Sequence, residues 1–124
     1  MTPPTPQRGS WYRKFANAFR GIVVGTRDQS SFDVHLIVAL AVVAAAWYLG
    51  VSRIEWCVLL LCIVAVLAAE LFNSAFEQLA KAVTEEEHPR IRDALDVCSG
   101  AVLVASIGAA AVGAIILGAR AFGI

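Results

Sequence analysis

Three long stretches of the chain contain no charged residue, and they decide which folds are open to it. These stretches cover residues 36–51, 56–69 and 97–119. A helix needs about 20 apolar residues to cross the hydrocarbon core of a bilayer. The third stretch has that length, the first reaches it by including Phe32, Val34 and His35, and the second by continuing past Glu70. We therefore predict an all-α integral membrane protein with spans at about 32–50, 54–82 and 90–119.

Composition and charge support this class and indicate an orientation. Hydrophobic residues make up 59% of the chain and charged residues 16%, whereas a soluble domain is close to half apolar and a quarter charged. A formal net charge of zero argues against a nucleic-acid partner. Of the Lys and Arg residues, five precede the first span and three lie at 81–92, against two on the other side. Because positive residues gather in the cytoplasm, we expect an inner-membrane protein with a cytoplasmic N-terminus and no cleaved signal peptide.

The segment before the first span, residues 1–31, has a pattern of its own. Its first nine residues include three prolines and are expected to be disordered. Ser10 offers an N-cap to a helix with an apolar face and a cationic face. The apolar face holds Trp11, Phe15, Ala18, Phe19, Ile22 and Val23. We predict an amphipathic helix in the headgroup layer, either a simple anchor or an element that admits lipid headgroups, beside a three-span domain at 32–124.

The second span carries a stripe of polar residues on one helix face. Its members are Glu70, Asn73, Ser74, Glu77 and Lys81, spaced at i, i+3, i+4, i+7 and i+11. A charged side chain deep in a bilayer costs on the order of 2.5–3.5 kcal/mol, so two carboxylates on one stripe need a reason. The stripe is either a polar seam between helices or a functional site.

The third span adds acidic groups at the same end and small residues further in. Pro89 suits the first turn of a helix, and Asp93, Asp96 and Ser99 follow at intervals of three residues. A small-residue ridge, which predicts close packing against another helix, consists of Ala101, Ala105, Ala109 and Gly113. The sequence has neither a GxxxxGK loop nor a GxGxxG motif, so nucleotide chemistry would need another design.

Residues 53–104 resemble the core of the prokaryotic diacylglycerol kinase and undecaprenol kinase family. The shared motifs are E-L-x-N-S-A-x-E at 70–77, E-x-H-P at 86–89 and D-x-x-S-G-A-V-L at 96–103. A weaker similarity covers the rest of the chain, including S-F-x-V-H-L at 31–36. The resemblance implies an ATP-dependent lipid kinase that uses Mg²⁺ and phosphorylates diacylglycerol or undecaprenol. It also implies homotrimers of three-span subunits with active sites shared between neighbouring chains.

The resemblance also implies roles for individual residues. Glu70 corresponds to the catalytic base that takes the proton from the lipid hydroxyl, and Asn73 to a positioning residue beside it. Glu77 corresponds to a magnesium ligand, and Ser99 to a residue near the lipid. The residues expected at the nucleotide are Glu77, Glu86, Glu87, His88 and Asp96.

Three positions depart from the family pattern. Gln29 stands where the family has a glutamate that shares the metal, Leu95 replaces a lysine paired with the aspartate at Asp96, and Lys81 replaces an aspartate. Because Lys81 lies one turn beyond Glu77, we hypothesise that it has taken over the phosphate contact of the missing lysine. A membrane scaffold without catalysis would explain the departures together, and an ion-coupled small transporter would explain carboxylates inside a membrane.

Overall fold

The computed structural model describes residues 10–27 and 29–124, and the predicted disordered tail at 1–9 lies outside them. Within the described residues the chain is helical, with no β-strand. The helices are α1 (Trp11–Thr26), α2 (Ser30–Leu49), α3 (Arg53–Val83) and α4 (Pro89–Phe122). The all-α class is confirmed.

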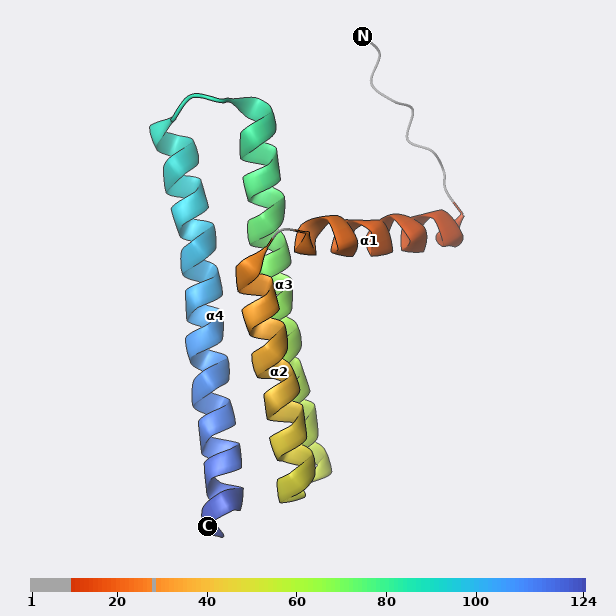
Figure 1. Ribbon diagram of the computed structural model, residues 1–124, viewed down its shortest axis with the longest axis vertical. Helices are drawn as coiled ribbons and strands as arrows, with labels where there is room; N and C mark the ends of the chain where they lie inside the picture. The colour runs from red at the N-terminus through yellow and green to blue at the C-terminus, as the bar shows by residue number, and fades with distance from the viewer. Residues whose placement is uncertain (1–9, 28) are drawn as a thin grey trace.

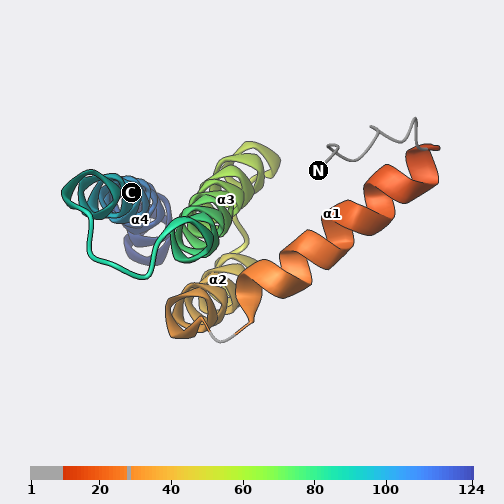
Figure 2. The ribbon, with the colours of Figure 1, turned by 90° about the horizontal axis from the view of Figure 1, so that it is seen from above.

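Helices α2, α3 and α4 run side by side as a bundle, and each is long and apolar enough to cross a membrane. Their bounds agree with the three predicted spans to within three residues at each end. Helix α3 packs mainly against α4, with α2 alongside both (Figures 1 and 2). The spans were predictable because an uninterrupted apolar stretch leaves few alternatives to a helix in lipid.

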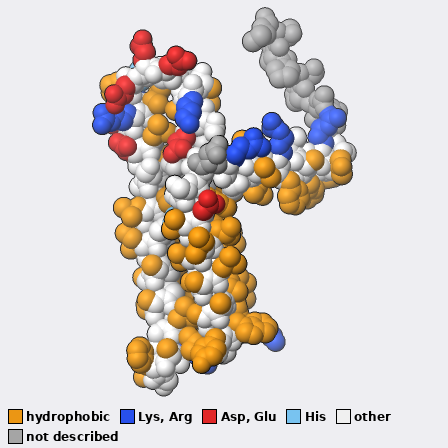
Figure 3. Space-filling view, in the orientation of Figure 1, with side chains coloured by type: hydrophobic (Ala, Val, Ile, Leu, Met, Phe, Trp, Pro, Cys, Tyr) orange, Lys and Arg blue, Asp and Glu red, His pale blue; other side chains and the backbone are white. Residues whose placement is uncertain are grey.

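Helix α1 projects sideways from the bundle (Figure 1). Its cationic side chains lie on the side nearer the α3–α4 loop, and its apolar side chains face the direction in which the apolar bundle extends (Figure 3). The Lys14 ammonium lies 5.0 Å from the centre of the Trp11 ring. Ser10 is the N-cap residue as expected, but its side chain makes no capping bond, and its carbonyl oxygen accepts from the Arg13 amide instead. This arrangement agrees with a helix lying in the membrane surface.

A close approach at Gly25 joins α1 to the bundle. A Cβ atom added at Gly25 would lie 2.9 Å from Cδ2 of Leu71 and 3.9 Å from Oγ of Ser74. The absence of a side chain therefore lets the end of α1 lie against α3 beside the polar stripe.

The tight turn between α2 and α3 is fixed by three local devices. Gly50 adopts the left-handed conformation at φ 66°, and the Val51 amide donates to Ala46. The Ser52 hydroxyl accepts from the Glu55 amide at 3.2 Å, while the Glu55 carboxylate accepts from the Ser52 amide at 2.9 Å. The same carboxylate accepts from Nε of Arg120 at 2.9 Å, which ties α3 to the end of α4.

Candidate active site

The polar stripe of α3 runs from the interior of the bundle to its surface near the α3–α4 loop. Glu70, Asn73 and Ser74 are buried, with exposed fractions of 5%, 8% and 2%. Glu77 is half-buried, and Lys81 is exposed. Exposure to solvent therefore increases along the stripe, from the buried Glu70 to the exposed Lys81.

Glu70 has a histidine neighbour that the sequence did not predict. Nε2 of His35, on α2, lies 2.9 Å from Oε1 of Glu70. A carboxylate away from water needs such a partner, because an unpaired buried charge is costly. The sequence held one signal for this residue: an ionisable side chain within a predicted span is rare and marks a functional site.

Glu77 receives two amide groups. Nδ2 of Asn73 donates to Oε1 of Glu77 at 3.1 Å, and Nε2 of Gln29 donates to Oε2 at 3.5 Å. The predicted metal pair of Glu77 and Gln29 is therefore brought together from α3 and the start of α2. Asn73, expected beside the base, directs its amide to Glu77 rather than to Glu70.

A cavity of about 350 Å³ lies between α3, α4 and the loop that joins them. It gathers every residue predicted at the nucleotide, together with Leu95, Thr84 and Arg92. The predicted residues that line it are Glu77, Lys81, Glu86, Glu87, His88 and Asp96. We call it the polar cavity.

The loop side of the polar cavity is ordered by local contacts. The Glu86 amide donates to Oγ1 of Thr84 at 3.0 Å. Arg92, which was not predicted from the sequence, also lines this cavity, and its Nη1 lies 2.9 Å from Oε1 of Glu87. His88 caps α4, because its Nδ1 accepts from the Arg90 amide at 3.2 Å. Nε2 of His88 has no hydrogen-bond partner among the described residues and could contact a ligand.

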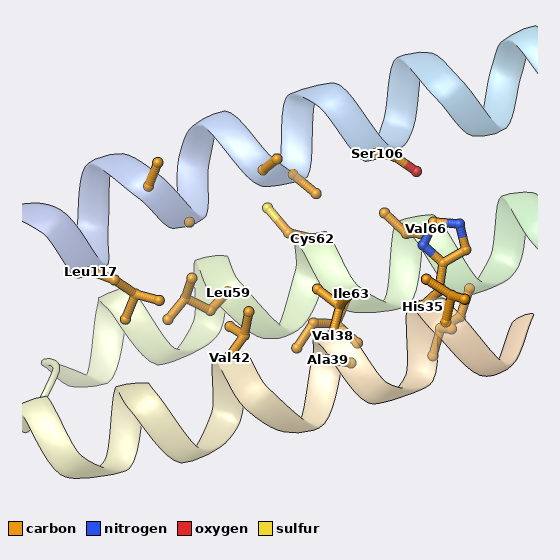
Figure 4. Close-up of a pocket in the computed structure, with 16 residues that line it drawn as sticks. His35, Val38, Ala39, Val42, Leu59, Cys62, Ile63, Val66, Ser106 and Leu117 are labelled. Atoms are coloured by element: carbon orange, nitrogen blue, oxygen red, sulfur yellow. The ribbon is translucent and has the colours of Figure 1, made fainter. Parts of the chain in front are cut away.

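A second cavity, of about 440 Å³, lies between α2, α3 and α4 further from the loop. Its walls are almost entirely apolar, with polar groups from His35 and Ser106 at one end (Figure 4). The Ser106 hydroxyl is buried and has no partner among the described residues. We call it the apolar cavity.

The second half of the predicted small-residue ridge of α4 borders this apolar cavity. Ala109 and Gly113 line the cavity, and a Cβ added at Gly113 would meet nothing within 4 Å. Ser99, expected near the lipid, is exposed on α4 and lines neither of the two cavities. Its role stays a prediction.

The fold and the site together define a class of protein. The protein is a small helical membrane protein with one buried carboxylate next to an apolar cavity and a second carboxylate, seven residues along α3, beside a charged cavity. Seven residues of helix are about 10 Å, a distance that two long side chains and a phosphate group span. Such an arrangement suits a reaction between a lipid and a polar, phosphate-bearing compound.

Comparison with known proteins identifies the family. Residues 16–117 match the family model described as prokaryotic diacylglycerol kinase. An undecaprenol kinase of Bacillus subtilis is 31% identical over 106 residues, which cover 86% of each chain. A diacylglycerol kinase of Synechocystis is 34% identical over 104 residues, covering 83% of this chain and 59% of the relative. A diacylglycerol kinase of Pseudomonas aeruginosa is 29% identical over 107 residues, covering 82% and 87%.

The chain belongs to the prokaryotic diacylglycerol kinase family. The predicted resemblance and the predicted enzyme class, a lipid kinase, are therefore confirmed.

Proposed function

We propose that this protein transfers the γ-phosphate of ATP to the hydroxyl group of a membrane lipid alcohol. The candidate substrates are diacylglycerol, which would give phosphatidic acid, and undecaprenol, which would give undecaprenyl phosphate. The observation that carries the proposal is the position of Glu70: it is 5% exposed, contacts His35, and lies between the apolar and polar cavities on the α3 stripe.

The chemistry assigns Glu70 the part of a general base. The lipid hydroxyl oxygen attacks the γ-phosphorus, and its proton passes to the Glu70 carboxylate. The bond from the γ-phosphorus to the oxygen bridging it to the β-phosphate breaks, and ADP leaves. Since such reactions need alignment and charge neutralisation more than covalent work by the protein, a rigid carboxylate on a long helix suits the task.

The polar cavity offers groups that could contact each part of ATP. Lys81 and Arg92 provide cations for phosphate oxygens, and Asp96 and the loop acids provide acceptors for ribose hydroxyls and the base amino group. Glu77 lies on the cavity wall nearest Glu70, so the γ-phosphate would point along α3 toward the base.

The donor set beside Glu77 fits a magnesium ion. Mg²⁺ is usually held by one or two carboxylates together with phosphates and waters, so a dedicated cage is unnecessary. Among the described residues no group of three or more His, Cys, Asp and Glu side chains forms such a cage. Glu77 offers a carboxylate, Gln29 an amide oxygen, and Asn73 a buried Oδ1 that has no partner among the described residues. When bound, the ion would neutralise charge on the β- and γ-phosphates.

The apolar cavity would receive the hydrocarbon part of the lipid. It begins at His35, next to Glu70, and continues along α4 from Ser106 to Leu117. Eleven residues of helix correspond to about 16 Å, close to half of a bilayer's hydrocarbon core. A lipid with its hydroxyl at Glu70 would therefore extend its chain away from the α3–α4 loop.

The placement of the chain follows from its substrates. ATP is cytoplasmic, so we place the N-terminus and the α3–α4 loop on that side, with α1 at the membrane surface and residues 32–124 as the catalytic domain. We further propose a homotrimer, as the family resemblance implies. Both cavities of the single chain are open, and a neighbouring subunit would cover them.

Transfer of labelled phosphate from ATP tests the proposal directly. Purified protein is offered diacylglycerol and undecaprenol separately in mixed micelles with Mg²⁺. We expect a labelled lipid product from at least one of them. Binding of ATP without transfer to either lipid would instead indicate a catalytically inactive scaffold.

A further inference from the structure

The contact between His35 and Glu70 joins two helices at the deepest polar point of the stripe. His35 comes from the second turn of α2 and Glu70 from the middle of α3, 35 residues later in the sequence. Nε2 and Oε1 are 2.9 Å apart, and the exposed fractions of the two side chains are 22% and 5%. Their meeting is therefore a product of the tertiary fold.

Two other glutamates of the chain have partners of a different kind from that of Glu70. Glu77 is approached by the neutral amides of Asn73 and Gln29, whereas Glu55 is paired with Arg120 at the far end of the bundle. Glu70 alone among these three meets an imidazole, which can donate an N–H without carrying a permanent charge.

Oε1 is the Glu70 oxygen that lies against the His35 ring. The described residues provide no hydrogen bond to the second oxygen, Oε2. His35 also lines the apolar cavity, and Figure 4 shows its ring at one end of that space, close to Ser106 of α4. A hydroxyl arriving from the apolar cavity would thus reach Glu70 past the imidazole ring.

We propose that His35 is a positioning residue for the lipid kinase reaction: it fixes the Glu70 carboxylate through Oε1 and leaves Oε2 to accept the proton of the lipid hydroxyl. This inference rests on the proposed function of Glu70 as the base. The arrangement follows a general pattern in which a base is itself oriented by a third group. His35 stays bound to Oε1 while Oε2 gains the proton, so it takes no part in the proton balance.

Three variants test the inference in the full-length protein. His35→Ala removes the ring, His35→Gln keeps an N–H donor at similar reach, and Asp33→Asn removes an exposed ionisable group from the same helix as a matched control. We expect His35→Ala to lower kcat about 10–100-fold, the loss typical when the partner that orients a functional group is removed. We expect the KM for ATP to stay within about twofold, because the polar cavity is untouched.

A conservative variant and a double mutant distinguish a positioning role of His35 from a purely structural one. His35→Gln should recover most of the lost kcat, and Asp33→Asn should match the parent. In a Glu70→Gln background, His35→Ala should cause no further loss, since it acts only through the Glu70 carboxylate. Melting temperatures of the solubilised variants identify any that fail to fold. If His35→Ala is one of them, the test rests on His35→Gln.

Several results would overturn the inference. They are an unchanged kcat in His35→Ala, a folded His35→Gln as slow as His35→Ala, and a further loss on adding His35→Ala to Glu70→Gln. Failure of the proposed function looks different: the parent itself would transfer no phosphate to any lipid alcohol, and the inference would fall with it.

Discussion

Lys81 and Leu95 line the same polar cavity, one from the end of α3 and the other from the second turn of α4. The family resemblance places a lysine at position 95 and an aspartate at position 81. A cation on α3 therefore shares a cavity with the apolar side chain that stands where the family has its lysine. This placement supports the hypothesis that Lys81 now contacts the phosphates of ATP.

Lys81→Ala should raise the KM for ATP several-fold and leave the KM for the lipid unchanged. The reason is the loss of a charge-assisted contact to phosphate. Adding Leu95→Lys should restore part of the affinity. Arg90→Ala is the control, because it removes one positive charge from the same end of the chain but does not line the polar cavity. Equal ATP kinetics in Lys81→Ala and the parent would reduce Lys81 to a membrane-surface anchor.

Gln29→Glu should lower the concentration of free Mg²⁺ needed for half-maximal activity. The Gln29 amide already lies 3.5 Å from Glu77, so a carboxylate there would add a negative oxygen ligand beside the first. The measurement is activity against free Mg²⁺ at saturating MgATP. Ser30→Glu adds the same charge one residue away on an exposed position and should have less effect. An unchanged Mg²⁺ dependence in Gln29→Glu would argue against a metal site at Glu77.

The apolar cavity can be tested by filling it. Ala109→Leu should raise the KM for the lipid about tenfold, a change of the size expected when a few methylene groups occlude an apolar site. Ala111→Leu makes the same change on an exposed face of α4 and serves as the control.

Cross-linking in detergent distinguishes two occupants of the cavity. The parent should yield trimers, and Ala109→Leu should retain them if the cavity holds lipid. Loss of trimers without a change in the KM for the lipid would mean that a helix from a second copy fills this space. A fully active monomer would rule out sites shared between chains.

The far end of the bundle offers a stability test that is separate from catalysis. Glu55 accepts from Arg120 and also belongs to the cap of α3, so Glu55→Gln should lower the melting temperature by a few degrees without changing kcat. Arg53→Gln removes a charge from the same end and should have a smaller effect. Equal melting temperatures for Glu55→Gln and the parent would show that the pair adds nothing measurable.

Much of this architecture was predictable from the sequence because its causes are local. The three apolar stretches leave little choice but helices in lipid, and helical spacing alone places Glu70, Asn73, Glu77 and Lys81 on one face. The motif at 86–89 and Asp96 could be assigned to one end of the bundle, since a short loop keeps consecutive helices adjacent.

The contacts between helices could not be predicted from such local patterns. Whether His35 meets Glu70 depends on how α2 is rotated about its own axis, and the hydropathy of α2 is too uniform to fix that rotation. The same applies to the Gln29 amide on Glu77, which comes from the residue before α2. The packing role predicted for the α4 ridge stays a prediction, since a Cβ added at Gly113 would meet nothing within 4 Å in the described chain.

The most direct test of the account compares phosphate transfer by the parent, Glu70→Gln and Glu85→Gln. Glu85 is an exposed loop glutamate that lines neither cavity, so its variant controls for the loss of one carboxylate. Transfer of labelled γ-phosphate to the preferred lipid is measured at saturating MgATP with protein that retains its parental melting temperature. If Glu70 is the base, Glu70→Gln loses a factor of about 10²–10⁴ in kcat, whereas Glu85→Gln matches the parent. A Glu70→Gln variant that turns over at nearly the parental rate would contradict the account, because Glu70 would then be a structural residue and the base would lie elsewhere.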